Sequence, residues 1–305
     1  MPAAQVALHQ PTFTPQLTTI DWAQEWQNLQ VARKASDDPA FWNERSKTYN
    51  CGRRTSPYAH QFIELAEIQP EETVFDMGCG TGALSIPLGL AGHSVIAGDF
   101  SEGMLGVLQR DCANLGITTV QTKVMSWEDD WVAHGVLPNS VDVAVASRSI
   151  ATADMRDSLE RLTSVARRRA CITLPTGSSP RTDERILSAI GIQDQLGRDF
   201  LYAFMILVQM GYQPEVRYIP SERHDTYASF DEAFENLTKM VYDAAEAMLS
   251  EAETARALEN LKTWLTDNLI DNPEQGRADA SGEPQKAYML KKPRIVTWAH
   301  ISWNK

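Results

Sequence analysis

Short apolar runs alternate with amphipathic stretches along the middle of this chain. Five apolar runs have the length and composition of buried strands: residues 73–77, 94–98, 118–124, 141–146 and 170–174. Three stretches with apolar residues at helical spacing separate them, near residues 83–91, 102–115 and 154–168. Such alternation predicts a parallel sheet with right-handed crossovers and helices on both faces. The run Arg167-Arg168-Arg169 is then expected to be the solvated end of a helix.

The flanking regions are more helical. Trp22, Trp26 and Leu29 recur at helical spacing and predict a helix over residues 21–34, and Ser56 followed by proline is typical of the start of another. Beyond residue 175, helical patterns run over about residues 184–211, and again from a capping-box sequence at Ser229 to about residue 270. The remaining segments predict a strand at 215–219, a loop at 271–286 and a last strand at 294–303.

Composition narrows the classes of function. The 305 residues are 43% apolar, which is enough for a sizeable core, and the net charge of −12 argues against a broad nucleic-acid surface. The longest apolar run, Leu201 to Val208, is too short to span a bilayer, and the N-terminus lacks a signal-peptide layout. We therefore expect a cytoplasmic protein. Four scattered cysteines and six scattered histidines predict neither disulfides nor a metal site.

The turn after the first predicted strand is the most specific sequence in the chain. Asp76 ends that strand, and Gly78, Gly80 and Gly82 follow at every second position. Glycines there allow close approach of a ligand to the backbone, and a helix just beyond would point free N–H groups toward it. A carboxylate at Asp76 would repel a pyrophosphate but suits a cation or a sugar hydroxyl. This favours S-adenosylmethionine, which carries a sulfonium and an ammonium group, over a dinucleotide.

Three later segments make the chain similar to the class I S-adenosylmethionine-dependent methyltransferases. Asp99 ends the second strand, where the family has an acid that binds the ribose hydroxyls, and Ser101 would cap the next helix. The segment around Trp127 follows the third strand, where family members hold the adenine, although Ser126 stands at the usual acid position. The fourth strand ends at Ser147, beside the methionine half of the cofactor.

The resemblance covers residues 41–175 and points to the small-molecule, quinone-biosynthesis-like branch. It implies a cofactor site made of the following residues: Asp76, Gly78, Cys79, Gly80, Gly82, Asp99, Phe100, Ser101, Met104, Ser126, Trp127, Glu128 and Ser147. Cys79 is expected to line the pocket without acting as a nucleophile. Met104 and Trp127 have a second interpretation, as ordinary core residues.

The fold expected from these patterns is α/β, with a Rossmann-like doubly wound sheet of about seven strands. Most strands would be parallel, with an antiparallel C-terminal strand, N-terminal helices and a helical insertion before the last strand. We predict one methyltransferase domain over residues 1–305. Its parts would be a helical lid at 1–56, a cofactor-binding core at 57–175 and a C-terminal half at 176–305, with the insertion at about 230–285.

Two alternatives concern the donor side of the reaction. Gly78, Gly80 and Ala83 also satisfy a relaxed dinucleotide fingerprint, and Asp99 would suit the ribose of NAD. Asp76, Gly82 and the Trp127 segment favour the methyltransferase over that dehydrogenase. A cofactor-binding regulatory module without turnover is the second alternative.

The acceptor side is less specific, and no catalytic residue is assigned. Weak candidates are Tyr49, which could close over the cofactor; Arg148, for an anionic acceptor or the cofactor carboxylate; and His224 beside Asp225, as a base or a surface group. No Asn-Pro-Pro-Tyr-type sequence follows the fourth strand. We predict methyl transfer to a small, partly apolar acceptor with S-adenosylhomocysteine as product. A macromolecular acceptor is the alternative, and the sequence predicts no oligomeric state.

Overall fold

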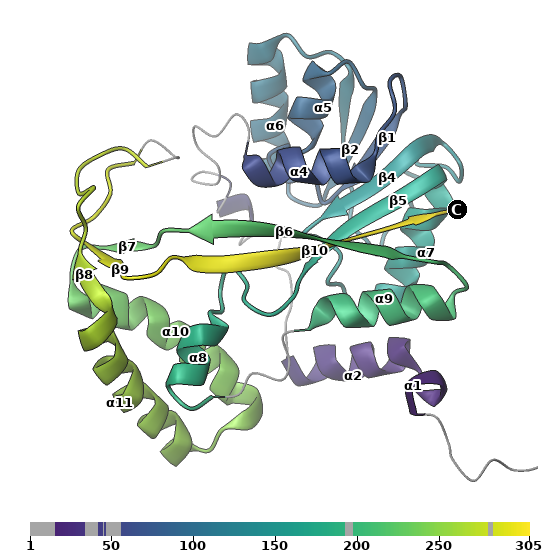
Figure 1. Ribbon diagram of the computed structural model, residues 1–305. Helices are drawn as coiled ribbons and strands as arrows, with labels where there is room; N and C mark the ends of the chain where they lie inside the picture. The colour runs from purple at the N-terminus through teal and green to yellow at the C-terminus, as the bar shows by residue number, and fades with distance from the viewer. Residues whose placement is uncertain (1–15, 34–41, 45, 47–55, 193–197, 280–282) are drawn as a thin grey trace, which may run out of the picture.

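The computed structural model describes residues 16–33, 42–44, 46, 56–192, 198–279 and 283–305. A seven-stranded sheet forms its centre, in the order β3-β2-β1-β4-β5-β10-β6 (Figure 1). Its strands are β1 Val74–Met77, β2 Val95–Asp99, β3 Val120–Val124, β4 Val141–Ser147, β5 Ala166–Pro175, β6 Glu215–Arg223 and β10 Arg294–Asn304. Strand β10 runs antiparallel to both neighbours, β5 and β6, and the pairings among β1 to β5 are parallel. The predicted fold class is confirmed.

The strand order reverses between β1 and β4. The chain passes from β1 outward to β2 and β3, then returns to place β4 on the other side of β1. In sheets of this kind, ligands bind beyond the carboxyl ends of the strands at such a switch point. The glycine turn that follows β1 therefore faces the segment that follows β4.

Helices cover both faces of the sheet (Figure 1). One face carries α4 (Pro57–Ala66), α5 (Ser85–Leu90) and α6 (Glu102–Leu115), and the other carries α2 (Trp22–Arg33), α7 (Met155–Val165) and α9 (Asp199–Gln209), with α1 (Gln16–Thr19) beside α2. Each face of the sheet has its own apolar core, and successive strand residues alternate between them. Phe75 and Met77 lie in the core under α2, α7 and α9, and Val74 lies in the core under α4 and α5. None of the helices in the described ranges is long and apolar enough to cross a membrane.

The arginine run lies in a strand, not at the end of a helix. Helix α7 ends at residue 165, and β5 begins one residue later. Arg168 pairs with Glu72 at 2.6 Å, and Arg169 is buried with a guanidinium nitrogen 2.9 Å from the Ser302 hydroxyl. These partners come from distant parts of the chain, so the local charge pattern could not reveal the strand.

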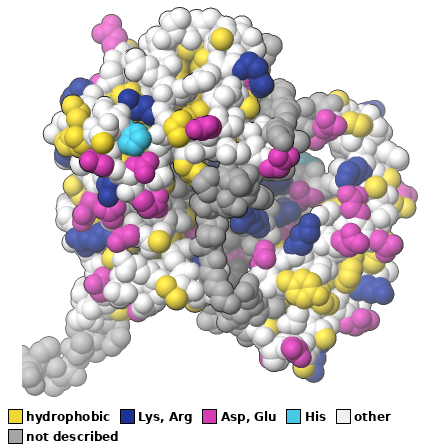
Figure 2. Space-filling view, turned by 180° about the vertical axis from the view of Figure 1, so that it is seen from behind, with side chains coloured by type: hydrophobic (Ala, Val, Ile, Leu, Met, Phe, Trp, Pro, Cys, Tyr) yellow, Lys and Arg dark blue, Asp and Glu magenta, His cyan; other side chains and the backbone are white. Residues whose placement is uncertain are grey.

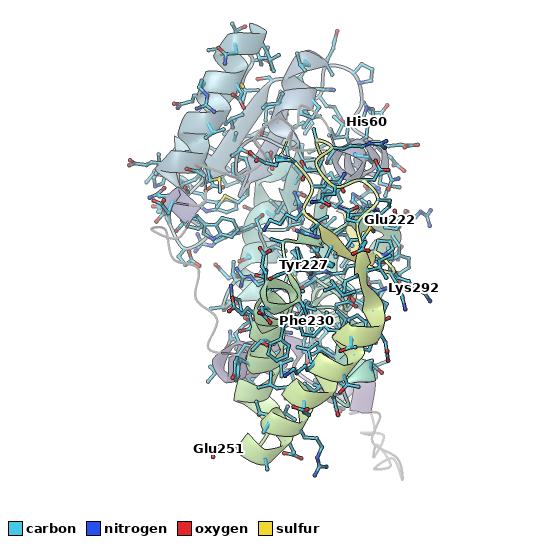
Figure 3. The ribbon with its side chains drawn as sticks, turned by 90° about the vertical axis from the view of Figure 1, so that its left-hand side faces the viewer. His60, Glu222, Tyr227, Phe230, Glu251 and Lys292 are labelled. Carbon is cyan, nitrogen blue, oxygen red and sulfur yellow. The ribbon has the colours of Figure 1, made fainter. Side chains whose placement is uncertain are left out.

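The C-terminal half builds a second unit with its own apolar core. It contains α8 (Glu184–Ala189), α10 (Phe230–Met248), α11 (Glu251–Asn268) and a small sheet of β7 (Thr226–Tyr227), β9 (Tyr288–Leu290) and β8 (Leu269–Asp271). The long strands β6 and β10 extend from the main sheet toward this unit (Figure 1). Seen from that side, α11 begins at Glu251 at the far tip, and Tyr227 and Phe230 lie where β7 meets α10 (Figure 3).

This unit corrects two expectations. The predicted helical region at 229–270 is two helices that pack on each other, because Ser250 and Glu253 form a capping box that starts α11. The predicted loop at 271–286 begins at the end of β8, and the small sheet was not predicted. Its strands are too short for a periodic sequence signal. The division into one domain with a lid, a core and an insertion stays a prediction.

Helix α2 provides a test of this architecture. Trp26 is 0% exposed, its indole N–H donates to the Thr152 carbonyl at 2.8 Å, and its ring centroid lies 5.6 Å from that of Tyr202. We expect Trp26→Ala to lower the free energy of unfolding by about 3–5 kcal/mol, because it leaves a cavity and an unpaired carbonyl. Val31→Ala is the control on the same helix, since Val31 is 79% exposed, and should change stability by less than about 0.5 kcal/mol. Urea unfolding measures both, and equal losses would contradict the docking of α2.

Candidate active site

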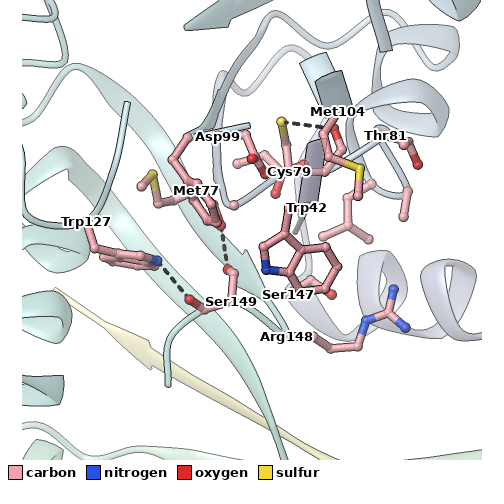
Figure 4. A pocket seen from close by; sticks show the side chains of 16 residues that line it. Trp42, Met77, Cys79, Thr81, Asp99, Met104, Trp127, Ser147, Arg148 and Ser149 are labelled. Carbon is pink, nitrogen blue, oxygen red and sulfur yellow. Dashed lines mark hydrogen bonds between the residues drawn. The ribbon is translucent and has the colours of Figure 1, made fainter. Parts of the chain in front are cut away.

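A cavity opens at the carboxyl ends of β1, β2 and β4 (Figure 4). Most of the residues that the sequence assigned to the cofactor line it: Asp76, Gly78, Cys79, Gly80, Asp99, Phe100, Met104, Trp127 and Ser147. Arg148 also lines it, as do six residues that the sequence did not assign: Trp42, Met77, Thr81, Ala83, Leu84 and Ser149. In the close-up, Trp127 and Arg148 lie at opposite ends of the site, with Trp42 between them.

The three glycines of the turn serve different purposes. All have the left-handed φ that favours glycine: +70° at Gly78, +54° at Gly80 and +91° at Gly82. A Cβ at Gly78 would lie 2.3 Å from the Cβ of Ser149, and one at Gly82 would lie 2.4 Å from Leu108. Those two glycines allow protein segments to pack on the turn. Nothing lies within 4 Å of a Cβ at Gly80, so only this glycine faces open space in the cavity.

The backbone of this turn is already hydrogen-bonded within the protein. The amides of Gly78 and Cys79 donate to the Gly98 carbonyl at 2.7 and 3.0 Å, and the amide of Gly80 donates to Asp99 at 2.8 Å. These three amides are therefore not available to a pyrophosphate, whereas a cation or a sugar would not need them. The N–H groups expected to face a ligand belong to the helix beyond the turn, and that expectation stays a prediction.

Asp99 keeps acceptor capacity toward the cavity. Its two carboxylate oxygens accept the backbone N–H groups of Gly80 and Ser101, each at 2.8 Å. A carboxylate offers about four lone-pair positions, more than these two N–H groups use. Asp99 is 6% exposed and lines the cavity. This geometry suits a pair of hydroxyl donors.

Asp76 is buried beside it and held by one hydroxyl. The Ser85 Oγ donates to Asp76 at 2.7 Å. Burial, opposed in part by that hydrogen bond and strengthened by the nearby Asp99, raises the pKa of Asp76 to about 7. The same burial, with the charges of both acids, raises the pKa of the Cys79 thiol. Cys79 is thus a neutral lining group, as the sequence predicted.

Trp127 packs in the core and also lines the cavity, and its contact with the adenine stays a prediction. Its indole N–H donates to the Ser149 carbonyl at 2.8 Å, and it belongs to the main core, 5.4 Å from the ring of Trp131. It also lines the cavity. Its neighbours Ser126 and Glu128 form the turn that precedes Trp131 and are not among the cavity-lining residues.

The start of α6 fixes an N-terminal segment over the cavity. Ser101 caps the helix by accepting the Met104 N–H at 3.1 Å, as predicted, and its hydroxyl donates to Asn43 at 2.7 Å. The Asn43 side chain also accepts the N–H of Gly103 at 3.0 Å. This double contact places the adjacent Trp42 on the cavity wall. The sequence predicted a lid here but gave no signal for Asn43, because its partners lie some sixty positions away.

The other acceptor-side candidates separate in space. His224 lies just beyond the end of β6, and its ring is 3.4 Å from the carboxylate of Glu222 on that strand. Asp225 instead pairs with Arg294. His224 is half exposed and is not among the cavity-lining residues, so the structure does not form the His224–Asp225 pair. Glu222 lies on β6 at the edge of the second unit (Figure 3). Tyr49 lies outside the described residues.

Comparison with known proteins agrees with this geometry. A family model for a methyltransferase domain matches residues 74–169, which run from the start of β1 past the glycine turn and into β5. Residues 74–169 form a methyltransferase domain, similar to those of the class I S-adenosylmethionine-dependent methyltransferases. The cofactor of this methyltransferase domain is S-adenosylmethionine.

Relatives of the methyltransferase include an uncharacterized protein of Haemophilus influenzae. It is 30% identical over 268 residues, which are 87% of this chain and 89% of that protein. A release factor glutamine methyltransferase of Cereibacter sphaeroides is 31% identical over 117 residues, 37% of this chain and 40% of that one. The YcgJ protein of Bacillus subtilis is similar in structure, with a TM-score of 0.48 and 13% identity over 81% of this chain and 97% of that one.

The residues of the cavity fit this cofactor. The cavity offers two carboxylates to a ligand with a sulfonium, an ammonium and two ribose hydroxyls, and Gly80 leaves space beside them. Among the described side chains, no group of three His, Cys, Asp or Glu residues is arranged to hold a metal ion. The donor set therefore suits the organic cation itself.

Gly80 supplies the test of this fit. We expect Gly80→Ala to weaken S-adenosylhomocysteine binding at least about tenfold, because a methyl group would enter the cavity and the left-handed backbone would be strained. Gly116→Ala is a matched control: Gly116 ends α6 with φ +69° and also has nothing within 4 Å of a Cβ. Both variants should lose about 1–2 kcal/mol of stability, and only Gly80→Ala should lose affinity in calorimetry. Equal affinities for the two variants would contradict the assignment.

Proposed function

We propose that this methyltransferase transfers the methyl group of S-adenosylmethionine to a small, partly apolar metabolite. The observation that carries the proposal is the wall of the cavity, where Trp42, Trp127 and Met104 lie close to two acids. The indoles and the thioether supply apolar contact surface, and the acids supply the match for a cationic donor. A segment from the N-terminal region, fixed by Asn43, narrows the space around the ligand.

Each lining group has a role in this proposal. Asp99, oriented by the amides of Gly80 and Ser101, accepts the ribose hydroxyls. Asp76 faces the cationic part of the donor, and Trp127 contacts the adenine. When bound, the cofactor supplies a methyl carbon made electrophilic by its sulfonium. The protein holds the acceptor atom in line with that carbon, which can lower the barrier by up to roughly 7–11 kcal/mol in favourable cases.

No general base is assigned to this reaction. Of the described cavity residues, Asp76 and Asp99 are the carboxyl groups, and both already accept hydrogen bonds from the protein. The thiol of Cys79 stays protonated because burial raises its pKa. An acceptor atom that has lost its proton before it binds needs no base in the site. Trp42 then acts by excluding water from the methyl group.

The surface also favours a small acceptor. On the face shown in Figure 2, acidic and basic side chains are interspersed, and they do not form a wide basic surface. A polyanion such as RNA would need many phosphate contacts from such a surface. The Cereibacter relative is named for glutamine in a release factor. In this chain, Ser147, Arg148 and Ser149 stand at the end of the fourth strand, where an Asn-Pro-Pro-Tyr-type sequence would be expected for such an acceptor. We therefore do not extend that acceptor to this chain.

Turnover is the test of the proposal. We expect S-adenosylmethionine to bind in calorimetry and S-adenosylhomocysteine to be released when a library of small metabolites is added. Binding without release from any metabolite, protein or RNA fraction would identify a regulatory module instead. Release with a protein or RNA fraction alone would identify a macromolecular acceptor, and either result would overturn the small-molecule proposal. Gly80→Ala is the negative control for cofactor binding.

Asp76 predicts how cofactor binding depends on pH. Without ligand, burial holds the pKa of Asp76 near 7, and an adjacent cation would lower it by favouring the carboxylate. Binding at a pH below about 7 must therefore release a proton, so S-adenosylmethionine affinity should rise with pH, by up to about tenfold per unit, and level off above about 7. Asp76→Asn should remove this slope. Calorimetry in buffers of different ionisation enthalpy measures the released proton, and an affinity independent of pH in the unmodified protein would contradict the role.

The raised pKa of Asp76 also makes the stability of the fold fall as the pH rises, whereas cofactor affinity should increase. Because the folded-state pKa of Asp76 lies above its ordinary value of 3.8, the folded chain holds the proton more tightly than the unfolded chain. This contribution to stability is complete below about pH 4 and is lost as the pH rises to about 7. Burying Asp76 therefore costs stability at neutral pH in the absence of a cation.

A further inference from the structure

Arg148 is a cation at the cavity wall that has no acidic partner among the described residues. Other arginines near the sheet are paired, such as Arg168 with Glu72 and Arg167 with Asp142. Within the described ranges, no carboxylate lies within ion-pair distance of the Arg148 guanidinium. Its permanent positive charge lies on the wall of a cavity that receives a cationic donor.

Two aromatic rings hold the guanidinium. Its central carbon lies 4.5 Å from the ring centroid of Tyr58 and 5.6 Å from that of Trp298. The Tyr58 hydroxyl is itself fixed by Ser147 at 2.8 Å and Thr173 at 2.6 Å. Stacking on aromatic faces leaves the N–H edge of a guanidinium free to bind a planar anion. Arg148 is thus oriented by its neighbours before any ligand arrives.

The backbone at Arg148 is strained in a way that keeps this orientation. Its φ is +61°, a left-handed conformation that is unusual for a residue with a side chain. The Arg148 N–H donates to the Thr173 hydroxyl at 3.1 Å, which ties the strained residue to β5. Strain of this kind persists only where the surroundings enforce it, and it gathers at functional sites.

The Arg148 side chain lies at one end of the cavity that it lines. Tyr58 and Trp298, which carry the guanidinium, are not among the residues that line the cavity. In Figure 4 the Arg148 side chain lies beyond Trp42, at the end of the site away from Trp127. The charge thus lies beside the donor cavity and not beneath the glycine turn. A cation in this place repels a sulfonium donor unless an anion lies nearby.

We propose that Arg148 binds an anionic group of the methyl acceptor, a carboxylate or a phosphate, and thereby selects acidic metabolites. This rests on the proposed transfer to a small metabolite. The anion would contact the free N–H edge of the guanidinium, and the acceptor atom would lie toward the cavity. The bound anion would also offset the repulsion between Arg148 and the sulfonium.

A binding experiment tests the site without knowledge of the natural acceptor. The protein is saturated with S-adenosylhomocysteine and titrated with benzoate, with its uncharged analogue benzamide, and with inorganic phosphate. We expect benzoate or phosphate to bind at least about tenfold more tightly than benzamide. Arg148→Gln should remove this preference and Arg148→Lys should keep part of it. Arg156→Gln, which removes an exposed arginine on α7, should leave it unchanged.

Arg148→Gly guards against a folding artefact. Glycine adopts φ +61° without strain, so this variant should unfold at a temperature no lower than Arg148→Gln while still losing the preference for anions. In a metabolite screen, acidic acceptors should show KM raised at least about tenfold in Arg148→Gln, with a smaller change in kcat.

Three results would overturn the proposal. The first is equal binding of benzoate, phosphate and benzamide to the unmodified protein. The second is a preference for anions that survives in both Arg148→Gln and Arg148→Gly. The third is a loss of S-adenosylhomocysteine affinity in Arg148→Gln with no loss for 5′-methylthioadenosine, which lacks the carboxylate, since Arg148 would then bind the cofactor. A screen that releases no product would refute the proposed transfer, while the benzoate titration would still decide whether Arg148 binds an anion.

Discussion

The close approach of Ser149 to Gly78 is the constraint on which the site depends. A side chain at Gly78 would collide with Ser149, so the segment after β4 can lie on the end of β1 only when that position is glycine. The Ser149 hydroxyl then donates to the Met77 carbonyl at 2.7 Å, and the Ser149 carbonyl accepts the Trp127 indole. One contact thus joins the ends of three strands, and the walls of the cavity follow from it.

Two buried acids beside this contact determine which ligand the cavity suits. Asp76 is 1% exposed and Asp99 6%, and burial together with the charge of Asp99 raises the pKa of Asp76. Such a pair costs stability in the empty protein and gains from a cation. The amides of the turn are already engaged, so the same turn that in outline resembles a dinucleotide fingerprint offers a phosphate little. Charge, and not the glycine spacing, separates the two ligand classes.

The sequence predicted the parts of the site that local rules control. Local backbone conformation explains the glycine turn and the Ser101 cap, and the end of strand β2 explains the place of Asp99. It missed the parts that depend on distant partners. Arg169 was expected in solvent because its strand neighbours could not be seen, and Trp42 reaches the cavity through the contacts of Asn43 with a remote segment. The small sheet of the second unit was missed for the same reason, because its short strands pair with distant parts of the chain.

The charges around the cavity form an ordered series. Asp76 and Asp99 lie at the glycine turn, and the cation of Arg148 lies beyond the end of β4, on rings fixed by Ser147 and Thr173. A positive donor placed between them is attracted to one side and repelled from the other, unless its co-substrate carries negative charge. An acceptor that arrives as an anion would cancel that repulsion and would also lie close to an electrophilic carbon. If Arg148 binds the acceptor as proposed, the arrangement couples recognition of the acceptor to placement of the donor.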